Sequence, residues 1–326
     1  MRAVRIQRFG GPEVLEVAEI EPPQPEDDEV LVELRAAGVN RADILLRSGS
    51  YHDAPPFPIV PGREGSGVVL GVGPGAAGLR PGDRVVGVVG RPGFYAEQIV
   101  VPAVRTVPIP DDLGWAEAAS LPTAWLTAWY CVRRLGRVRP GETVLVQAAA
   151  SGVGDAAVQI AKHAGARVIA AAGSDEKVGW ALEHGADEGV NYERHDVVAE
   201  ALRITGDRGV DVVIDAVGGR VFPSSLKATG HGARVVALAN VTLEDSTVNT
   251  RDFYPKNVTI YGFQIANLME RGYDPRPDLE ELIPLVADGT FRVHIDKTFP
   301  LAEAEAAHRY LEERRNRGKV VLVPGS

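Results

Sequence analysis

The stretch TVLVQAAASGVGDAAVQIAKHAGARVIAAA, residues 143–172, decides the fold because it contains a strand, a turn, a helix and a second strand. Residues 143–147 form a short β-branched run of the kind that is buried in a sheet. Apolar residues recur at helical spacing over residues 155–164, and residues 167–171 are strand-like again. Two strands joined through a helix at this spacing predict a parallel sheet.

The same alternation continues towards the carboxy-terminal side. Apolar runs predict further strands, and helical spacing predicts the segments between them. The predicted strands are 188–190, 210–216 and 233–238, and the predicted helices are 175–184, 197–204 and 220–229. This order predicts an α/β, doubly wound domain whose parallel sheet is covered on both faces.

Residues 1 to about 120 have a different texture, with short β-type runs separated by turns rich in Gly and Pro. These runs, which predict an all-β domain of irregular strands, are 30–34, 67–72, 84–89 and 95–101. After residue 262 the pattern changes once more. Helices are expected at 278–288 and 301–315, and a closing strand at 319–323 is expected to return to the first domain.

Composition narrows the class of protein. A length of 326 residues suggests about two domains, and a formal charge of −9 argues against nucleic acid or anionic membranes as partners. The sequence has no apolar run of about 20 residues and no recognisable signal peptide, so we expect a cytoplasmic protein. A single cysteine, Cys131, excludes an internal disulfide and a thiolate zinc cage.

The turn after residue 147 has the context of a dinucleotide-binding loop. In the pattern G-x-G-x-x-G its positions are Ala149, Ser151 and Gly154, with Gly152 and Val153 between them. Small residues let the backbone approach a pyrophosphate, and the helix start offers free N–H groups to it. We therefore predict that these five residues bind a dinucleotide.

The end of the second strand should select the dinucleotide. It reads VIAAAGSDEK, residues 168–177, with no acid at the strand tip to bind the ribose 2′-OH of NAD. Ser174 and Lys177 are candidates for holding a 2′-phosphate, although Ser174 is also a suitable helix cap. Asp175 and Glu176 suit the helix dipole but repel a phosphate. NADPH is the preferred cofactor, and NADH remains the alternative.

Three segments together resemble a known family. PGREGSGVVLGVGPGAAGLRPGDRVVG (residues 61–87) looks like the amino-terminal hallmark of medium-chain dehydrogenases/reductases. VQAAASGVGDAAVQIAKHAGARVIAAAGSDEKVGWALEHGADEGVNY (residues 146–192) resembles the cofactor half of the zeta-crystallin-like quinone oxidoreductases, a zinc-free branch. LAEAEAAHRYLEERRNRGKVVLV (residues 301–323) is similar to that family's ending, so the resemblance covers essentially the whole chain.

The resemblance implies an α/β protein with a GroES-like β-rich catalytic domain over residues 1–122. A doubly wound Rossmann cofactor-binding domain with a parallel sheet would cover residues 123–262, and residues 263–326 would return to the catalytic domain. The family also has a cleft between the domains, and it implies a homodimer as the minimum assembly, with tetramers left open.

The resemblance also implies that no metal takes part. Asn40 stands where the zinc-dependent branch has a cysteine, Arg63 stands in place of a histidine, and Glu64 is retained. The loop with four cysteines that binds structural zinc is missing, because Gly90 leads almost directly into GFYAEQ. A zinc site needs three or four converging ligands, so we expect none here.

Residues carried over from the family define the expected catalytic site. Asn40 and Asp43 match an N-x-x-D motif, in which Asn40 would face the nicotinamide and the substrate. Asp43 has an equally good alternative role as a loop cap. Tyr51 matches a tyrosine of the substrate pocket, unless it only packs a loop. Thr127 is expected beside the nicotinamide face.

Further residues are expected to contact the cofactor. Tyr192, together with Ser174 and Lys177, matches the family's contacts to the adenosine phosphate. The backbone near Phe263 should meet the carboxamide, and Asn240 is a further expected cofactor contact. No histidine is assigned to catalysis, and the residues expected on helix surfaces are His163, His184, His195 and His308.

Without a metal, an acceptor that stabilises negative charge by conjugation is easier to reduce than a simple ketone. Tyr51, Asn40 or an ordered water would stabilise the resulting anion. The preferred function is an NADPH:quinone reductase. An enone or 2-alkenal reductase and an NADPH-binding protein of low turnover both remain open, because fold-level analogy does not fix the substrate.

Overall fold

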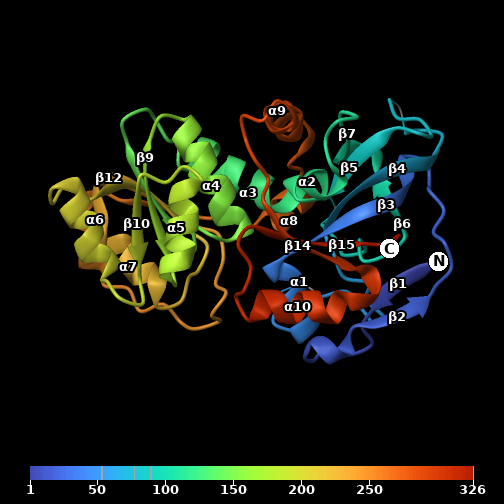
Figure 1. Cartoon of the computed structure of the whole chain (residues 1–326), viewed down its shortest axis with the longest axis horizontal. Helices are drawn as coiled ribbons and strands as arrows, with labels where there is room; N and C mark the ends of the chain where they lie inside the picture. Colours follow the sequence, from blue (N-terminus) through green and yellow to red (C-terminus); the bar gives the residue numbers. More distant parts are fainter. Residues whose placement is uncertain (53, 77, 89, 326) are drawn as a thin grey trace. The chain divides into compact units, whose positions relative to one another are not determined.

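The computed structural model describes residues 1–52, 54–76, 78–88 and 90–325. The described chain divides into two compact units. One unit comprises residues 1–126 and 265–326, and the other comprises residues 127–264. Figure 1 labels many of the helices and strands of both units.

The second unit contains the predicted parallel sheet, with strand order β10-β9-β8-β11-β12-β13 and every neighbouring pair parallel. In chain order this is 3-2-1-4-5-6, the arrangement of doubly wound dinucleotide-binding domains. The predicted fold class is therefore confirmed. The strands are β8 (Thr143–Gln147), β9 (Arg167–Ala172), β10 (Glu188–Asn191), β11 (Val210–Asp215), β12 (Thr229–Ala237) and β13 (Thr259–Gly262).

Helices cover this sheet, and the pattern of buried residues explains how. Leu145, Ile169, Val213 and Val235 form one row across the sheet and are buried in a cluster with residues of α6 and α7. Helices α4 and α5 pack against β8, β9 and β10. Right-handed crossovers place them on the other face. The helices are α3 (Leu126–Trp129), α4 (Gly152–His163), α5 (Asp175–Glu183), α6 (Val197–Thr205) and α7 (Val221–Lys227).

The first unit is built on a largely antiparallel sheet of order β14-β15-β3-β4-β5-β7, in which β6 also pairs with β3. The carboxy-terminal strand β15 pairs antiparallel with the end of β3, so Lys319 lies near Asn40. Strands β1 and β2 form a separate ribbon. The strands are β1 (Arg2–Arg5), β2 (Glu16–Glu19), β3 (Glu29–Val39), β4 (Glu64–Val72), β5 (Arg84–Val88), β6 (Gln98–Pro102), β7 (Thr106–Pro108), β14 (Ile295–Pro300) and β15 (Lys319–Val323).

The prediction that the amino-terminal region is all β was wrong, because it also contains helices. The helices of the first unit are α1 (Arg41–Ser48), α2 (Trp115–Ala119), α8 (Ile265–Glu270), α9 (Arg276–Ala287) and α10 (Ala304–Glu312). The N-x-x-D motif starts α1, since the Asp43 carboxylate accepts a hydrogen bond from the Asn40 N–H at 2.8 Å. A short helix depends on such a cap for its stability. The N-x-x-D motif was therefore the feature of the sequence that could have predicted α1.

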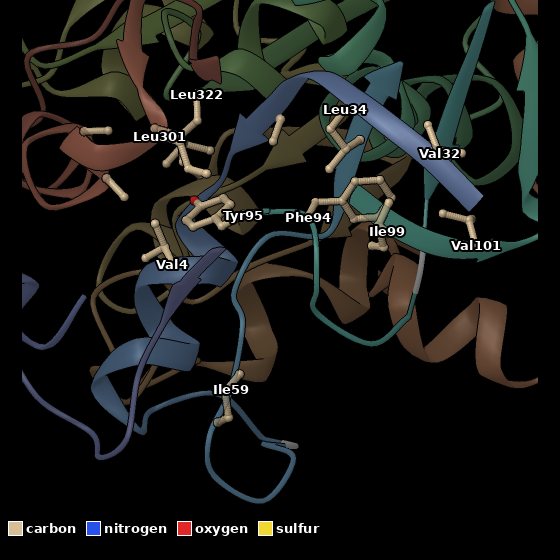
Figure 2. Close-up of a cluster of buried hydrophobic side chains, with 14 of the residues drawn as sticks. Val4, Val32, Leu34, Ile59, Phe94, Tyr95, Ile99, Val101, Leu301 and Leu322 are labelled. Carbon is tan, nitrogen blue, oxygen red and sulfur yellow. The ribbon is translucent and has the colours of Figure 1, made fainter. Parts of the chain in front are cut away.

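The core of the first unit surrounds two aromatic rings. Figure 2 shows Phe94 and Tyr95 among aliphatic side chains that include Val4, Leu34 and Leu322. Tyr95 is fully buried, so its hydroxyl must find a partner inside the protein. Over the described residues, no helix combines the length and the apolar character that crossing a membrane requires.

Candidate functional site

A buried polar cluster forms where β3, β4 and β15 meet in the first unit. The Asn40 side chain donates from Nδ2 to Glu64 Oε1 at 2.7 Å, and its Oδ1 accepts from Lys319 Nζ at 2.8 Å. Lys319 also donates to Glu64 Oε1 at 2.7 Å, which makes a buried ion pair. Both ends of the Asn40 amide are therefore fixed.

Glu64 is occupied on both of its oxygens. Besides Asn40 and Lys319 at Oε1, the Thr123 N–H donates to Oε2 at 2.7 Å. A buried carboxylate is tolerated when it is paired and hydrogen-bonded, and both conditions hold here. The retained glutamate thus holds Asn40 and the segment at Thr123 in place.

This donor set does not suit zinc. The groups around the Glu64 carboxylate are an amide, an ammonium and a backbone N–H, and the neighbouring Arg63 is a cation rather than a ligand. Zinc requires three or four Cys, His or carboxylate ligands. Within the described ranges of the chain, no three His, Cys, Asp or Glu side chains gather closely enough to hold a metal. The residues present therefore do not fit a metal ion.

A second group of buried hydrogen bonds forms a chain that reaches the start of α1. The Tyr95 hydroxyl donates to Asp43 Oδ2 at 3.2 Å and lies 3.1 Å from His308 Nε2. His308 Nδ1 lies 3.3 Å from Arg47 Nη1, which can only donate, so Nδ1 accepts and Nε2 carries the proton. The direction of every bond follows: Arg47 to His308, His308 to Tyr95, and Tyr95 to Asp43.

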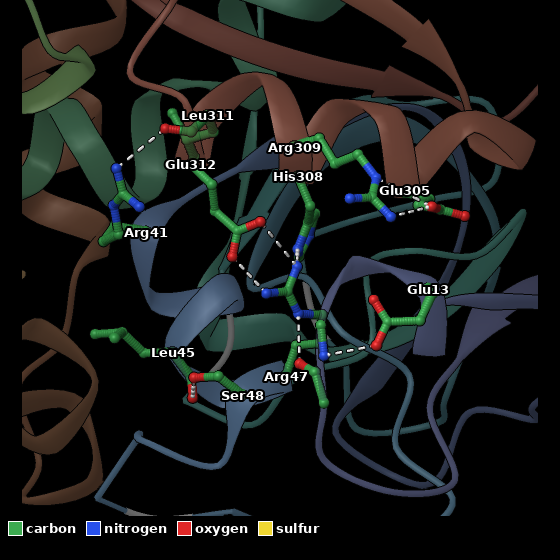
Figure 3. A network of polar contacts seen from close by, with 12 residues as sticks. Glu13, Arg41, Leu45, Arg47, Ser48, Glu305, His308, Arg309, Leu311 and Glu312 are labelled. Carbon is green, nitrogen blue, oxygen red and sulfur yellow. Dashed lines mark hydrogen bonds and ion pairs between the residues drawn. The ribbon is translucent and has the colours of Figure 1, made fainter.

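The chain ends in an ion pair closer to solvent. Figure 3 shows the Arg47 guanidinium between His308 and Glu312, and Arg47 Nη2 pairs with the Glu312 carboxylate. Arg47 Nε also donates to the Gly10 carbonyl at 3.2 Å. The nearby Arg41 donates to the Leu311 carbonyl at 3.1 Å. Helices α1 and α10 are thus held together by their charged side chains.

Burial shifts the pKa values in this chain. Desolvation raises the pKa of Asp43 to about 6, against the opposing field of Arg63 and the hydrogen bond from Asn40. Desolvation, with Arg47 and Arg41 adding to it, lowers the pKa of His308 to about 3. His308 is therefore a neutral imidazole at physiological pH. It was expected on a helix surface, and that expectation was wrong because it is fully buried.

Tyr51 lines a cavity of about 270 Å³ in the first unit. The other polar side chains in its wall are His52, Arg63, Arg91, Asn267 and Glu270. The Arg63 guanidinium lies over the Tyr51 ring, 4.5 Å from the ring centre. Tyr51 thus lies beside a pocket, as the substrate role requires, and it also packs against a side chain, as the alternative requires.

In the second unit, the turn between β8 and α4 has the geometry of a phosphate-binding loop. Ser151 caps α4, because its hydroxyl accepts from the Gly154 N–H at 3.0 Å. A Cβ at Gly154 would lie 2.2 Å from the Ala148 carbonyl oxygen, so only glycine fits against the turn. Ala149 is buried, whereas Gly152 and Val153 are half-buried at the helix start. The first-turn N–H groups lack intrahelical acceptors, which suits a pyrophosphate.

The tip of β9 was expected to recognise the 2′-phosphate. Ser174 caps α5 by accepting from the Lys177 N–H at 3.2 Å, which is the alternative role foreseen for it. Asp175 accepts from Asn191 and forms an ion pair with Arg194. This pair offsets Asp175, one of the two acids that complicated the NADPH prediction, and it places an exposed guanidinium nearby. The sequence reasoning missed Arg194, although its position two residues after Tyr192 was a signal.

Tyr192 lies directly against the glycine that follows β9. A Cβ on Gly173 would meet the Tyr192 hydroxyl oxygen at 2.6 Å, so the absence of a side chain makes room for the phenol. Tyr192 remains exposed, at 37%. An exposed ring at the strand tip is able to stack on a base.

The other predicted residues, one catalytic and two cofactor-binding, lie elsewhere in the second unit. Thr127 is buried in α3. The Phe263 ring stacks on Tyr130 at 5.0 Å, and its N–H already donates to the Ala237 carbonyl. The Asn240 amide donates to the Glu244 carbonyl at 2.9 Å, within an exposed loop. Their contacts with a cofactor stay predictions.

Two family models match this chain. Residues 26–111 match the model described as alcohol dehydrogenase GroES-like domain, and residues 152–288 match the one described as zinc-binding dehydrogenase. The chain is 34% identical to a quinone oxidoreductase of Pseudomonas aeruginosa, over 99% of each protein.

Solved structures agree with the family models. The Escherichia coli quinone oxidoreductase in complex with NADPH has a TM-score of 0.93 and 31% identity, over 99% of this chain and 100% of that one. A structure described as an NAD-dependent alcohol dehydrogenase has a TM-score of 0.91 and 39% identity, over the whole of both chains. The chain belongs to the quinone oxidoreductases of the medium-chain dehydrogenase/reductase superfamily and is an oxidoreductase.

Proposed function

We propose that this oxidoreductase uses NADPH to reduce a quinone without a metal ion. The observation that carries the proposal is the way Glu64 is used. Both of its oxygens accept hydrogen bonds, from Asn40, Lys319 and Thr123, so the carboxylate acts in positioning rather than in metal binding. A protein that polarises its substrate with hydrogen bonds alone is best matched to acceptors that spread negative charge by conjugation.

The chain's own residues would orient the acceptor and exclude water. Glu64 and Lys319 hold both ends of the Asn40 amide, so this side chain keeps a fixed position. Asp43 holds the Asn40 backbone at the start of α1. The hydride is the chemistry that NADPH supplies when bound. The Tyr51 hydroxyl would then stabilise the developing anion and protonate it.

The choice of NADPH over NADH rests on the tip of β9. An NAD-binding site of this fold places a free carboxylate there to bind the ribose hydroxyls. Here the Asp175 carboxylate is taken up by Asn191 and Arg194. Lys177 and Arg194 supply positive charge for a 2′-phosphate, and Tyr192 offers a ring for the adenine. The NAD-dependent neighbour makes this selection the point to test first.

The test follows the absorbance of the reduced cofactor with purified protein. NADPH and NADH are each offered with a small naphthoquinone and with a medium-chain 2-alkenal. We expect NADPH oxidation with the quinone and little with NADH. Activity confined to the alkenal would move the assignment to double-bond reduction. Binding of NADPH without turnover of either acceptor would favour the NADPH-binding protein.

The assembly and location are proposals of the same kind. We propose that the protein is a homodimer in the cytoplasm. Its substrate would be a quinone or another small conjugated carbonyl compound. Light scattering during size-exclusion chromatography measures the mass of the protein. A monomer at micromolar concentration would overturn the proposed dimer.

A further inference from the structure

The cavity beside Tyr51 is lined by a cationic side chain to which the proposed function gives no role. Its volume of about 270 Å³ lies just below the range of about 300–1,000 Å³ that is common for small-molecule sites. It has one cationic side chain that is almost fully buried, Arg63, and a second cationic side chain, Arg91, that is exposed. The carboxylate in its wall, Glu270, is exposed as well.

Arg63 is only 5% exposed, yet few of its donors are satisfied. Nη1 donates to the Gly90 carbonyl, the guanidinium lies over the Tyr51 ring, and Nε is buried without a hydrogen-bond partner. Among the residues that the structure describes, no carboxylate pairs with Arg63 within 4.0 Å. A buried guanidinium is costly unless an anion compensates it.

One compensating charge among the described residues acts at a distance, without a hydrogen bond to Arg63. Asp43 feels the field of Arg63, which partly offsets the rise in its pKa. That carboxylate is already bound at Oδ2 by the Asn40 N–H and the Tyr95 hydroxyl. Arg63 therefore keeps guanidinium donors without a hydrogen-bond partner in the wall of a cavity of about 270 Å³. Guanidinium groups recognise planar anions through two parallel hydrogen bonds.

We propose that the Tyr51–Arg63 pocket selects acceptors that carry a carboxylate or a similar planar anion beside the conjugated carbonyl. The guanidinium of Arg63 binds this anion and the Tyr51 ring packs against the conjugated part. This inference deepens the proposed reductase function and rests on it for turnover. The anion binding that it requires is independent of turnover.

The kinetic test compares a naphthoquinone that carries a carboxylate with neutral methyl-naphthoquinone in the same preparation. The measured quantity is the ratio of kcat/KM for the anionic acceptor to that for the neutral one. Each acceptor has the same intrinsic reactivity with every variant. A change in the ratio between variants therefore reflects a change in how the protein recognises the anion. In Arg63→Gln we expect the ratio to fall at least about tenfold, since a charge-assisted hydrogen bond is lost.

Matched variants separate the binding of an anion from a general loss of structure. Arg63→Lys keeps the charge but not the planar fork, so its ratio should lie between those of wild type and Arg63→Gln. Arg91→Gln removes the exposed cation of the same pocket and should change the ratio by less than about threefold. Arg35→Gln, which removes an exposed pair with Glu33 on the long strand β3, should match wild type. An equal fall for both acceptors in Arg63→Gln would overturn the proposal, because Arg63 would then act on the reaction or the fold.

A binding experiment keeps the inference testable if no quinone is reduced. Calorimetric titration with benzoate and with benzamide compares an anion with its neutral counterpart. We expect wild type to prefer benzoate and Arg63→Gln to lose that preference. Absence of quinone turnover together with this result would reject the proposed function and retain the anion site. Equal affinities for both ligands in wild type would reject the anion site.

Discussion

Tyr95 and His308 lie 213 residues apart in the sequence, yet the Tyr95 hydroxyl oxygen is 3.1 Å from His308 Nε2, inside the core of the first unit. Their rings meet edge to face at 84°, with centres 5.7 Å apart. Because Arg47 donates to the opposite ring nitrogen, His308 must donate to Tyr95, and Tyr95 in turn donates to Asp43. Each group in this chain fixes the role of the next.

Removing the Tyr95 hydroxyl should destabilise the protein without opening a cavity. Tyr95→Phe keeps the ring packing but leaves the His308 N–H buried without an acceptor and removes one donor from Asp43. We expect a loss of about 1–3 kcal/mol in the free energy of unfolding, measured by urea denaturation. Tyr310→Phe is the control, because its hydroxyl bonds Asp296 in a half-buried position and should matter less. Equal losses for the two variants would contradict the expectation.

The pH dependence of stability should carry the signature of His308. Its folded pKa of about 3 lies below the usual unfolded value near 6.5, so the unfolded chain binds the proton first. The contribution is complete above pH 6.5 and is lost as the pH falls towards 3, at about 1.4 kcal/mol per pKa unit. His308→Gln should flatten the fall of the melting temperature in this window.

Asp43 acts with the opposite sign in the same region. Its pKa is raised in the folded state to about 6, so the stability it contributes is complete below pH 3.8 and is lost as the pH rises through 6. Asp43→Asn should therefore remove part of the loss of stability between pH 4 and 6. Thermal unfolding of both variants across pH 3–8 separates the two contributions. Parallel curves for wild type and both variants would mean that neither group is shifted.

Structural features that depend on residues close together in the sequence could be predicted, whereas contacts between distant residues could not. The spacing of residues 143–172 fixes the β8–α4–β9 unit, because a strand and a helix have different periods. The burial of His308 was also accessible, since Ala304, Ala307, His308 and Leu311 form one helical stripe. The contacts of Asn40 with Glu64 and Lys319 were not, because they join the start of α1 to two strands that are distant in sequence.

The Lys319–Glu64 pair should show strong coupling. Lys319→Met leaves the fully buried Glu64 carboxylate without its counter-charge, and we expect a loss of about 3–5 kcal/mol. The double variant with Glu64→Gln should be more stable than Lys319→Met alone, because no buried charge then remains. A double-mutant cycle by chemical denaturation measures this coupling. Additive effects would show that the pair does not act as a unit.

Cofactor selection should depend on the cations near Tyr192. Arg194→Ala removes the guanidinium that pairs with Asp175, which frees a carboxylate at the tip of β9. Both changes disfavour a 2′-phosphate, so the preference for NADPH over NADH should fall at least about tenfold, measured as a ratio of dissociation constants by fluorescence titration. Lys177→Ala should lower the same ratio by removing charge alone. Arg203→Ala, an exposed helix residue paired with Glu200, serves as the control.

Tyr51→Phe tests proton delivery in the proposed mechanism. The ring that packs under Arg63 is kept and only the hydroxyl is lost, so the pocket should keep its shape. Delivery of a proton by a positioned side chain is usually worth about 10²–10⁴-fold, but an ordered water can replace a hydroxyl at the pocket edge. We therefore expect a modest fall in kcat, at the low end of this range or below it. NADPH affinity should be retained, because the variant changes no residue of the proposed phosphate-binding loop at the start of α4.

The pH profile distinguishes a proton donor from a packing residue. If the hydroxyl protonates the product anion, the fall in kcat should grow with pH, since the variant depends on hydronium from solution and its concentration falls as the pH rises. If Tyr51 only packs the loop, Tyr51→Phe should behave like wild type at every pH and Tyr51→Ala should raise KM. An unchanged rate in Tyr51→Phe across the profile would remove the hydroxyl from the mechanism, and Arg63 and Arg91 would then remain as donors in the wall of the pocket.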